Sequence, residues 1–330
     1  MKSKLLIVLS VLLVASFIIA GCAPKAAPAK VFKVAGMGPD LENPAWAAMY
    51  TGFVDKAKEL GMEAKLFNAS GQPNTQFKNA QDIATQEYDA VVVSGTDSST
   101  ANAAVKEFNT AKIPVWILHI KPDDASAKFV AMVDAQNVGG NYDAGIYLAD
   151  TYKAKGMTGV AAEITISLAR SNGAARHEGF KKAMDEKGIV LKEVKEAITY
   201  TRDESYKFAQ DLINANPDLS ILWCNYDEAV LGALKAIEDA GKSGQILVGG
   251  FDGSPESLKA VKDGRINVMA IQPLYYHGTI VAQQMFDFLT SGKQPETIST
   301  PCPLVTTENA ATEAQKYLAD CFGPTAKFPA

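Results

Sequence analysis

The residues that most often carry catalysis or hold metals are few in this chain. Its three histidines, His119, His177 and His277, lack the spacing of a metal site. There is no G-x-S-x-G elbow, no P-loop and no C-x-x-C, and His177-Glu178 lacks the second histidine of a zinc-protease helix. Gly36-Met37-Gly38 follows a predicted strand, but no third glycine completes a dinucleotide fingerprint. The sequence therefore predicts a binding protein, not an enzyme, with no cofactor and no metal.

Composition and charge indicate what kind of protein this is and which partners it does not bind. The chain has 330 residues, of which 47% are hydrophobic and 21% charged, as is typical of a folded soluble protein. This length suits two lobes better than one small core. The formal net charge is −5, and without Lys2 and Lys4 of the leader 30 basic residues face 37 acidic ones, a charge near −7. An acidic protein without a basic block is not expected to bind nucleic acid.

The first residues predict export. A short cationic start precedes an apolar run at Leu5–Ile19, which is typical of a secretory signal and shorter than the ~20 residues of a membrane-spanning helix. Ile19-Ala20-Gly21-Cys22 resembles a bacterial lipobox with Ile in place of the usual Leu, which implies lipidation at Cys22 and an anchor in the membrane. We expect a signal peptide at residues 1–21 and a flexible tether at residues 22–30.

From Val31 onward, short apolar runs alternate with longer amphipathic stretches. The predicted strands of the first half are Phe32–Ala35, Glu63–Phe67, Ala90–Ser94 and Val115–His119, and its helices are Pro44–Leu60, Asn74–Gln86 and Thr100–Ala111. The strands of the second half are Gly159–Ile164, Val190–Ile198, Ser220–Cys224 and Ile246–Phe251, and its helices are Gly140–Lys155, Gly173–Gly188, Asp203–Asn216 and Ala229–Ala240. Two such series predict two α/β lobes, each with a doubly wound parallel sheet, and ligands collect beyond the carboxyl ends of such strands.

Three cysteines follow Cys22. Cys224 lies in an apolar run and is predicted to be a buried strand thiol. Cys302 and Cys321 are close in sequence, and a disulfide between them would close a loop of about 20 residues and stabilise the fold by ~3 kcal/mol. Because spacing does not fix geometry, the alternative that these cysteines stay reduced remains open.

Several segments resemble the sugar-binding periplasmic proteins of the ribose-binding type, which are type I substrate-binding proteins of ABC importers. These segments are Glu42-Asn43-Pro44-Ala45-Trp46, Ile113-Pro114-Val115, Arg176-His177-Glu178-Gly179-Phe180, Asp227-Glu228-Ala229-Val230-Leu231-Gly232-Ala233-Leu234 and Val248-Gly249-Gly250-Phe251-Asp252-Gly253. The resemblance runs from about Val31 to about Asn309. It implies two lobes joined by three chain crossings, near Val133–Gln136, Ile271–Pro273 and Thr300–Pro303. The N-terminal lobe would then hold residues 31–134 and 273–300, and the C-terminal lobe residues 135–272 and 301–330.

The resemblance also implies a set of ligand contacts. The matching residues are the amide Asn43, the aromatic Trp46 against a sugar ring, the fork-shaped Arg176, the carboxylate Asp252, Gln272 near the hinge and the aromatic Tyr200. Each has a structural alternative: Asn43 as a helix N-cap, Trp46 as core, Arg176 as a solvated helix residue, Asp252 as a turn residue and Gln272 as a hinge contact.

Two departures from the family pattern affect the expected ligand. His119-Ile120 stands where the family has an Asp-Arg pair, and Tyr226 stands where it has Asn, with Asn225 one step earlier. Each lost charge-assisted bond is worth roughly 1.5–3 kcal/mol. We therefore expect a less charged pocket that suits a deoxy sugar, a polyol or a modified sugar better than ribose or galactose.

The resulting prediction is a monomeric extracytoplasmic protein that closes around a small polar ligand and delivers it to an ABC permease. The alternatives are a sensor that presents ligand to a chemoreceptor or receptor kinase, and a binder of a non-sugar ligand such as a nucleoside. Truncation of Trp46 or Arg176 is expected to weaken binding and to leave the melting of the unliganded protein nearly unchanged.

Overall fold

The fold comes from a computed structural model that describes residues 30–329. The predicted signal peptide, the lipidation site Cys22 and all but the last residue of the predicted tether lie outside the described residues. From Phe32 onward the chain forms one unit, which contains two sheets.

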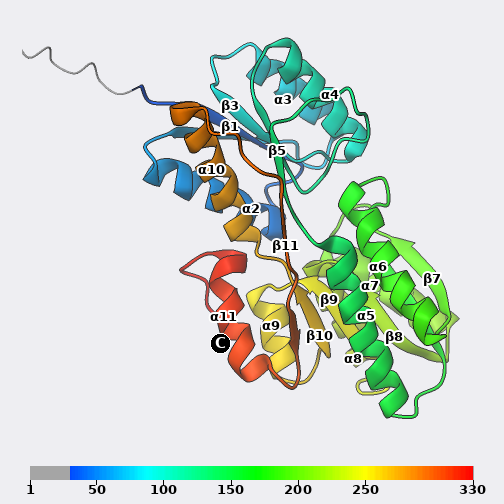
Figure 1. Cartoon of the computed structure of the whole chain (residues 1–330). Coiled ribbons are helices and arrows are strands. Elements are labelled where there is room, and N and C mark those ends of the chain that lie inside the picture. Colours follow the sequence, from blue (N-terminus) through cyan, green and yellow to red (C-terminus); the bar gives the residue numbers. More distant parts are fainter. Residues whose placement is uncertain (1–29, 330) are drawn as a thin grey trace, which may run out of the picture. The chain divides into compact units, whose positions relative to one another are not determined.

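The first sheet has the strand order β11-β5-β4-β3-β1-β2, and all its printed pairings are parallel. Its strands are β1 (Lys33–Gly38), β2 (Glu63–Asn68), β3 (Ala90–Val93), β4 (Val115–Leu118), β5 (Ala131–Ala135) and β11 (Ile298–Thr300). Helices α2 (Pro44–Glu59) and α10 (Leu274–Ser291) pack against one face, and α3 (Pro73–Ala84) and α4 (Ser98–Thr110) against the other (Figure 1). This sheet and its helices form the N-terminal lobe.

The second sheet repeats this plan with the order β12-β10-β9-β8-β6-β7. Its strands are β6 (Val160–Thr165), β7 (Leu191–Glu196), β8 (Leu219–Cys224), β9 (Leu247–Asp252), β10 (Val268–Ile271) and the antiparallel β12 (Leu304–Thr306). Helices α5 (Asn137–Ala154) and α6 (Ser171–Lys187) cover one face. The other face is covered by α7 (Arg202–Ala215), α8 (Asp227–Asp239), α9 (Pro255–Lys262) and α11 (Ala310–Phe322). The predicted fold of two parallel-sheet α/β lobes is confirmed.

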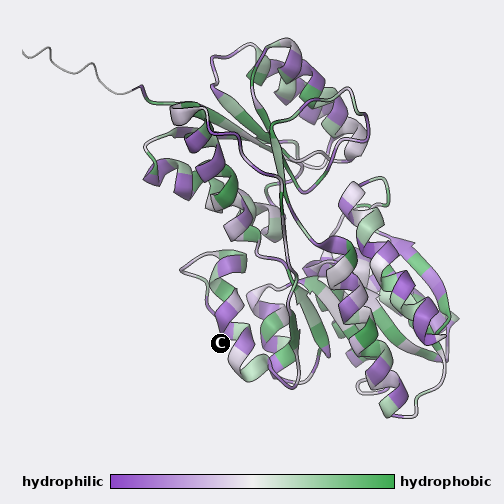
Figure 2. Ribbon diagram, in the orientation of Figure 1, coloured by the Kyte–Doolittle hydropathy of each residue, from purple (hydrophilic) through white to green (hydrophobic). Residues whose placement is uncertain are grey.

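The apolar faces of these helices meet the sheets, and Figure 2 shows hydrophobic strands between helices whose outer faces are polar. Buried side chains form four clusters, one on each face of each sheet. Local signals fix the helix ends: Asn43 caps α2, which begins at Pro44, and Ser254 caps α9. Gly188 ends α6 in the left-handed region at φ 68°.

The chain crosses between the sheets after β5, after β10 and between β11 and β12. These positions agree with the crossings expected near Val133–Gln136, Ile271–Pro273 and Thr300–Pro303. β5 runs one residue beyond the expected lobe boundary at residue 134. α11 contacts α9 of the second lobe and also α10 of the first, so the C-terminal segment touches both lobes.

The three cysteines of the described chain are free, buried thiols, so the disulfide considered between Cys302 and Cys321 is absent. Cys302 packs with Phe251 in the cluster under α5 and α6, whereas Cys321 packs in the cluster under α8 and α9. The two thiols therefore lie on opposite faces of the same sheet. Cys224 is a fully buried strand residue, as predicted.

Candidate functional site

A cavity of about 380 Å³ lies where the carboxyl ends of both sets of strands face one another. It is lined by Asp40, Asn43, Pro44, Ala45, Trp46, Met49, Ser70, Gly71, Gln72, His119, Ile166, Arg170, Asn172, Arg176, Ile198, Thr199, Tyr200, Tyr226, Asp227, Glu228, Asp252, Ser254, Gln272 and Leu274. The six matching residues are among them, and so are His119 and Tyr226, which were predicted to contact the ligand at the two departures from the family pattern. Most lining residues follow a parallel strand, which is where open α/β sheets collect ligands. The structure thus brings the predicted site residues to one place.

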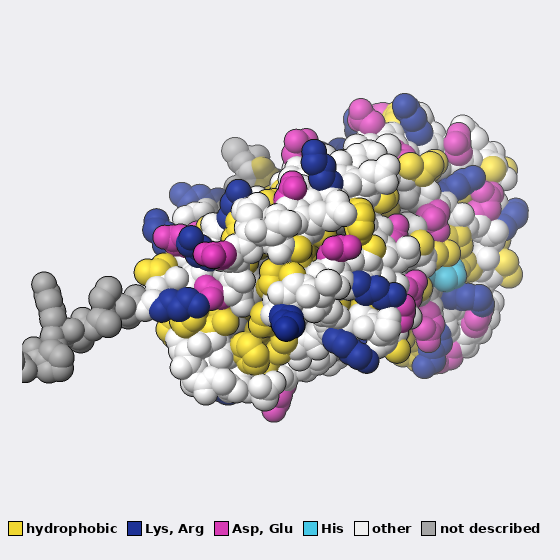
Figure 3. Space-filling view, turned by 90° about the horizontal axis from the view of Figure 1, so that it is seen from above, with side chains coloured by type: hydrophobic (Ala, Val, Ile, Leu, Met, Phe, Trp, Pro, Cys, Tyr) yellow, Lys and Arg dark blue, Asp and Glu magenta, His cyan; other side chains and the backbone are white. Residues whose placement is uncertain are grey.

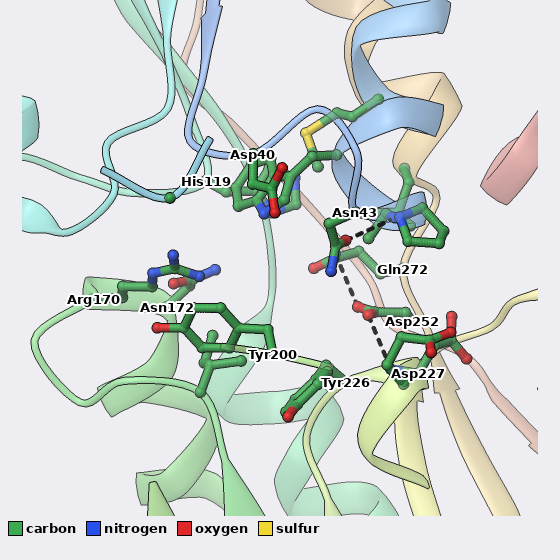
Figure 4. Close-up of a pocket in the computed structure, with 18 of the residues that line it drawn as sticks. Asp40, Asn43, His119, Arg170, Asn172, Tyr200, Tyr226, Asp227, Asp252 and Gln272 are labelled. Atoms are coloured by element: carbon green, nitrogen blue, oxygen red, sulfur yellow. Dashed lines mark hydrogen bonds between the residues drawn. The ribbon is translucent and has the colours of Figure 1, made fainter. Parts of the chain in front are cut away.

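The N-terminal lobe contributes an amide and an aromatic ring. The Asn43 side chain accepts a hydrogen bond from the backbone N–H of Ala45 at 3.0 Å, so this residue caps α2 and also faces the cavity (Figure 4). Trp46 is 9% exposed and belongs to the core cluster as well as to the cavity wall. Its ring meets that of His119 edge-on, with centroids 6.0 Å apart. Both residues therefore have a structural role and also line the cavity.

His119 begins a buried chain of hydrogen bonds behind the cavity. Its Nε2 lies 2.8 Å from Nδ1 of His277, whose Nε2 lies 2.7 Å from Oγ1 of Thr300. Nδ1 of His119 lies 3.5 Å from a carboxylate oxygen of Asp134. Burial lowers the pKa of His119 and lowers that of His277 to about 3, while burial raises the pKa of Asp134 to about 7. The two imidazole rings are therefore neutral at pH 7. The series of hydrogen bonds connects the cavity wall to two of the crossing segments.

In the C-terminal lobe, Arg176 is 3% exposed and is engaged by protein groups on every side. Its Nε donates to Oδ1 of Asn137 at 2.9 Å, Nη1 donates to the carbonyl of Asn225 at 2.7 Å, and Nη2 donates to Oε1 of Gln272 at 2.9 Å. The guanidinium also stacks on the ring of Phe251, 4.2 Å from its centroid. The interpretation of Arg176 as a solvated helix residue is wrong, because the side chain joins α5, α6, the end of β8 and the crossing after β10.

Asp252 ends β9 with φ at 102°, a strained backbone for an aspartate. Its carboxylate lies 3.7 Å from Nη1 of Arg176, accepts from Nε2 of Gln272 at 3.2 Å, and accepts from the N–H of Asp227 at 3.3 Å (Figure 4). Burial raises the pKa of Asp252, and Arg176 opposes that rise. Asp227 is also buried, and its raised pKa comes from burial and from Asp252. This end of the cavity offers carboxyl and amide groups held in place by one another.

Two tyrosines complete the wall. Tyr200 and Tyr226 meet edge-on with ring centroids 6.1 Å apart, and the Tyr226 hydroxyl lies 2.9 Å from Oγ of Ser205. Tyr200 has φ at 56°, in the left-handed region, where a bulky residue is uncommon. Their faces and that of Trp46 provide apolar surface of the kind that covers the C–H face of a ring.

Sequence reasoning missed Arg170 and Asn172, which follow β6, and the acidic residues Asp40 and Asp227. The expectation of a less charged pocket considered only the position after β4, whereas Arg170 brings a second buried guanidinium to the wall from the other lobe. Proximity to the carboxyl end of a strand was the signal that could have found these residues.

Neither a metal cluster nor a membrane span is found in the part of the chain that the structure describes. In residues 30–329, no group of three or more His, Cys, Asp or Glu side chains could hold a metal ion. No helix in this range is both long and apolar enough to cross a bilayer. Basic and acidic side chains are interspersed over the face in Figure 3, with apolar atoms between them.

Comparison with known proteins places this geometry in a family. A family model of the periplasmic binding protein domain matches residues 34–294. The ribose import binding protein of Bacillus subtilis (strain 168) is 29% identical over 266 residues, which cover 81% of this chain and 84% of that protein. The ribose import binding protein of Salmonella typhimurium is 32% identical over 227 residues, which cover 68% of this chain and 74% of that protein.

Solved structures show the same fold. The myo-inositol binding protein of Caulobacter, bound to myo-inositol, has a TM-score of 0.80 at 22% identity and covers 88% of this chain and 99% of its own. A Mycobacterium smegmatis protein in complex with beta-D-fucofuranose has a TM-score of 0.81 at 18% identity, with coverage of 88% and 98%. The matching family model and the two relatives are all named as binding proteins. With two parallel-sheet lobes, a cavity at their strand ends and a family model that spans most of its length, this chain belongs to the periplasmic binding protein family.

Proposed function

We propose that this protein captures a monosaccharide or a related polyol and delivers it to an ABC importer. The observation that carries the proposal is the cavity itself, whose wall combines aromatic faces, amide groups and carboxyl groups from both lobes with two guanidinium groups from the C-terminal lobe. Aromatic faces suit the apolar side of a sugar ring, and the polar groups suit its hydroxyls. The relatives named for ribose import support the same class of ligand.

The mechanism is closure of the two lobes on the ligand. Asn43 and Trp46 belong to the first lobe, and Asp252 to the second, so a ligand gains both sets of contacts only when the lobes meet. A ligand with more contacts in the closed form shifts the equilibrium toward that form. The volume of about 380 Å³ lies at the small end of ligand pockets and suits one small molecule.

The cellular setting follows as part of the same proposal. Acylation of Cys22 would hold a monomer at the outer side of the membrane, where an ABC permease recognises the closed form. The tether between Cys22 and the folded unit would allow this docking. Mass spectrometry of the protein from membranes tests the anchor: a diacylglyceryl-modified Cys22 supports it, and an unmodified mature N-terminus contradicts it.

A thermal-shift screen tests the ligand class. We expect D-ribose, D-allose, D-apiose or myo-inositol to raise the melting temperature, because a ligand that binds only the folded state stabilises it by RT ln(1 + [L]/Kd). At 100 times Kd this amounts to about 2.7 kcal/mol. Nucleosides serve as the contrasting class. A shift with a nucleoside and with no carbohydrate in a broad panel would overturn the proposal.

A further inference from the structure

Arg170 is a buried cation that the protein itself leaves partly unused. It precedes α6, is 6% exposed and lies on the cavity wall. Its Nε donates to the carbonyl of Thr96 at 2.7 Å, and its guanidinium lies over the Tyr200 ring, 4.2 Å from the centroid. No carboxylate of residues 30–329 forms an ion pair with it, and its two terminal nitrogens make no hydrogen bond to a described group. These two nitrogens are not among the fully buried atoms that lack a partner, so they reach the open cavity and are free to donate to a ligand.

Asn172 stands beside it with the same deficit. Its side chain is 3% exposed, lines the cavity and makes no hydrogen bond to the described residues. Its Oδ1 is a buried acceptor without a donor. Figure 4 shows Arg170 and Asn172 together above Tyr200, at the end of the cavity away from Asp252. A buried amide oxygen without a donor and a guanidinium whose terminal nitrogens have no protein acceptor therefore lie together at one end of the cavity.

This end of the cavity lies close to the segment that follows β4. The backbone N–H of Lys121 donates to Oγ of Ser171 at 2.8 Å, which places Arg170 beside His119-Ile120. The family resemblance leads one to expect an Asp-Arg pair at that segment. Here the first lobe lacks the arginine, and a guanidinium reaches the cavity from the second lobe.

We propose that Arg170 and Asn172 form a hydroxyl-binding subsite that takes one end of a neutral polyhydroxylated ligand. The inference deepens the proposed function and rests on it. A hydroxyl accepts from the guanidinium and donates to an amide oxygen, so it satisfies both side chains, whereas a carboxylate cannot donate. The cavity wall also holds four acidic residues against two arginines, which disfavours an anionic ligand; these are Asp40, Asp227, Glu228, Asp252, Arg170 and Arg176.

The same guanidinium links ligand and closure. Because Nε of Arg170 holds a carbonyl of the first lobe, the terminal nitrogens reach their final place only when the lobes meet. The neighbouring bonds, from Ser98 N–H to the Ala169 carbonyl at 3.2 Å and from Ser171 N–H to Ser98 Oγ at 3.1 Å, join the same two loops. Ser98 does not line the cavity, so it offers a control that weakens this contact between the lobes without touching ligand.

Isothermal titration of the whole mature protein tests the subsite. The probe is whichever of D-ribose, D-allose and myo-inositol binds the wild type most tightly, together with its singly deoxygenated forms and the corresponding sugar acid. We expect Arg170→Met and Asn172→Ala each to bind the probe at least about tenfold more weakly, since a charge-assisted hydrogen bond is lost, and Ser98→Ala to lose less than about threefold. One deoxy form should bind the wild type weakly and lose nothing further in Arg170→Met, because the missing hydroxyl and the missing guanidinium are partners.

Three results would overturn the inference while the proposed function stands: an unchanged affinity of Arg170→Met for the probe, equal losses in Arg170→Met and Ser98→Ala, or tighter binding of the acid than of the neutral form. Equal losses would mean that Arg170 only joins the lobes. If the wild type binds no carbohydrate probe, the proposed function is wrong and the subsite falls with it.

Discussion

Removing the guanidinium of Arg176 tests whether this arginine stabilises the C-terminal lobe, while Arg170, the other buried arginine, serves the ligand. The sequence predicts that this change spares the unliganded protein, but the geometry predicts the opposite. Nε, Nη1 and Nη2 of Arg176 are all bonded to protein groups, one of them the carbonyl of Asn225. Arg176→Met keeps much of the volume, while it removes all three hydrogen bonds and the stacking of the guanidinium on Phe251.

The expected cost follows from the groups left behind. Asn137 and Gln272 each lose a donor, and the carboxylate of Asp252 loses the cation 3.7 Å away in a buried setting. Breaking a buried ion pair by removing one partner costs about 3–5 kcal/mol. At about 2–4 °C per kcal/mol for a unit of 150–250 residues, the melting temperature of the unliganded C-terminal lobe should fall by roughly 6–20 °C.

The assay is thermal unfolding without ligand, followed by circular dichroism at pH 7. Arg170→Met is the matched control, because its guanidinium makes one hydrogen bond to a protein group, and that bond joins the lobes instead of holding one lobe together. We expect the control to cost less than Arg176→Met, about 1.5–3 kcal/mol at most, because it loses a single charge-assisted hydrogen bond. If Arg176→Met melts within 2 °C of the wild type, or if the control is the more damaging change, the structural role assigned to Arg176 is wrong.

Three further changes probe the cavity wall, the lobe core and the hinge. Trp46→Ala should weaken binding of the best carbohydrate probe at least tenfold and also destabilise the unliganded protein by about 3–5 kcal/mol, because the ring belongs both to the core and to the cavity wall. Calorimetry and thermal melting of the same samples check both effects. Gly278→Ala should lower the melting temperature by several degrees, since a Cβ there would lie 1.9 Å from a backbone oxygen of α2; an unshifted melt would contradict this. Burial lowers the pKa of His277 to about 3, so the unfolded state binds a proton at a higher pH than the folded state does, and stability is lost as pH falls from about 6.5 toward 3. In His277→Gln this loss is absent, so the free energy of unfolding near pH 5 should fall less steeply than in the wild type, by roughly 1.3 kcal/mol per pH unit. Urea titrations at several pH values measure the two slopes.

The regular part of the fold was accessible from sequence because local signals and tertiary structure agree there. α2 was predicted over Pro44–Leu60 and spans Pro44–Glu59, since a cap, a proline at the start and an apolar stripe all point to one helix. β2 begins at Glu63 as predicted. Such agreement is expected where each short apolar run is bounded by a turn residue.

The segments after β9 were not predicted as elements, and length explains this for β10, β11, β12 and α9, although not for α10 with 18 residues and α11 with 13. β10 has four residues, and β11 and β12 have three each, which is too short for a periodic signal. These strands exist because the edge of a sheet is available to them, and that information is not local. α9, with eight residues, is close to the lower limit of a recognisable helix.

The cysteine pair shows the same limit in another form. Nineteen positions separate Cys302 from Cys321, a spacing that permits a loop but says nothing of which face of a sheet each residue meets. Cys302 precedes β12 and packs beneath α5 and α6, while α11 carries Cys321 to the opposite face. A sheet then stands between the two thiols. The short distance between the two cysteines in sequence therefore did not predict whether their thiols meet.

In the candidate site, the sequence predicts which residues reach the cavity, but it does not predict how many of their hydrogen-bonding groups remain free for a ligand. Position after a strand brought Arg176 and Asp252 to the cavity, because the topology of parallel sheets fixes where such residues gather. It could not tell that three of the five N–H donors of Arg176 would bind protein groups, or that both terminal nitrogens of Arg170 would be free of protein partners. Hydrogen-bond capacity is finite, so a residue that matches a family contact can have fewer donors left for a ligand than its type suggests. A substitution in one lobe, such as Ile120 at the place of an arginine, can likewise be offset from the other lobe, and only the three-dimensional count of donors and acceptors reveals which arginine is available.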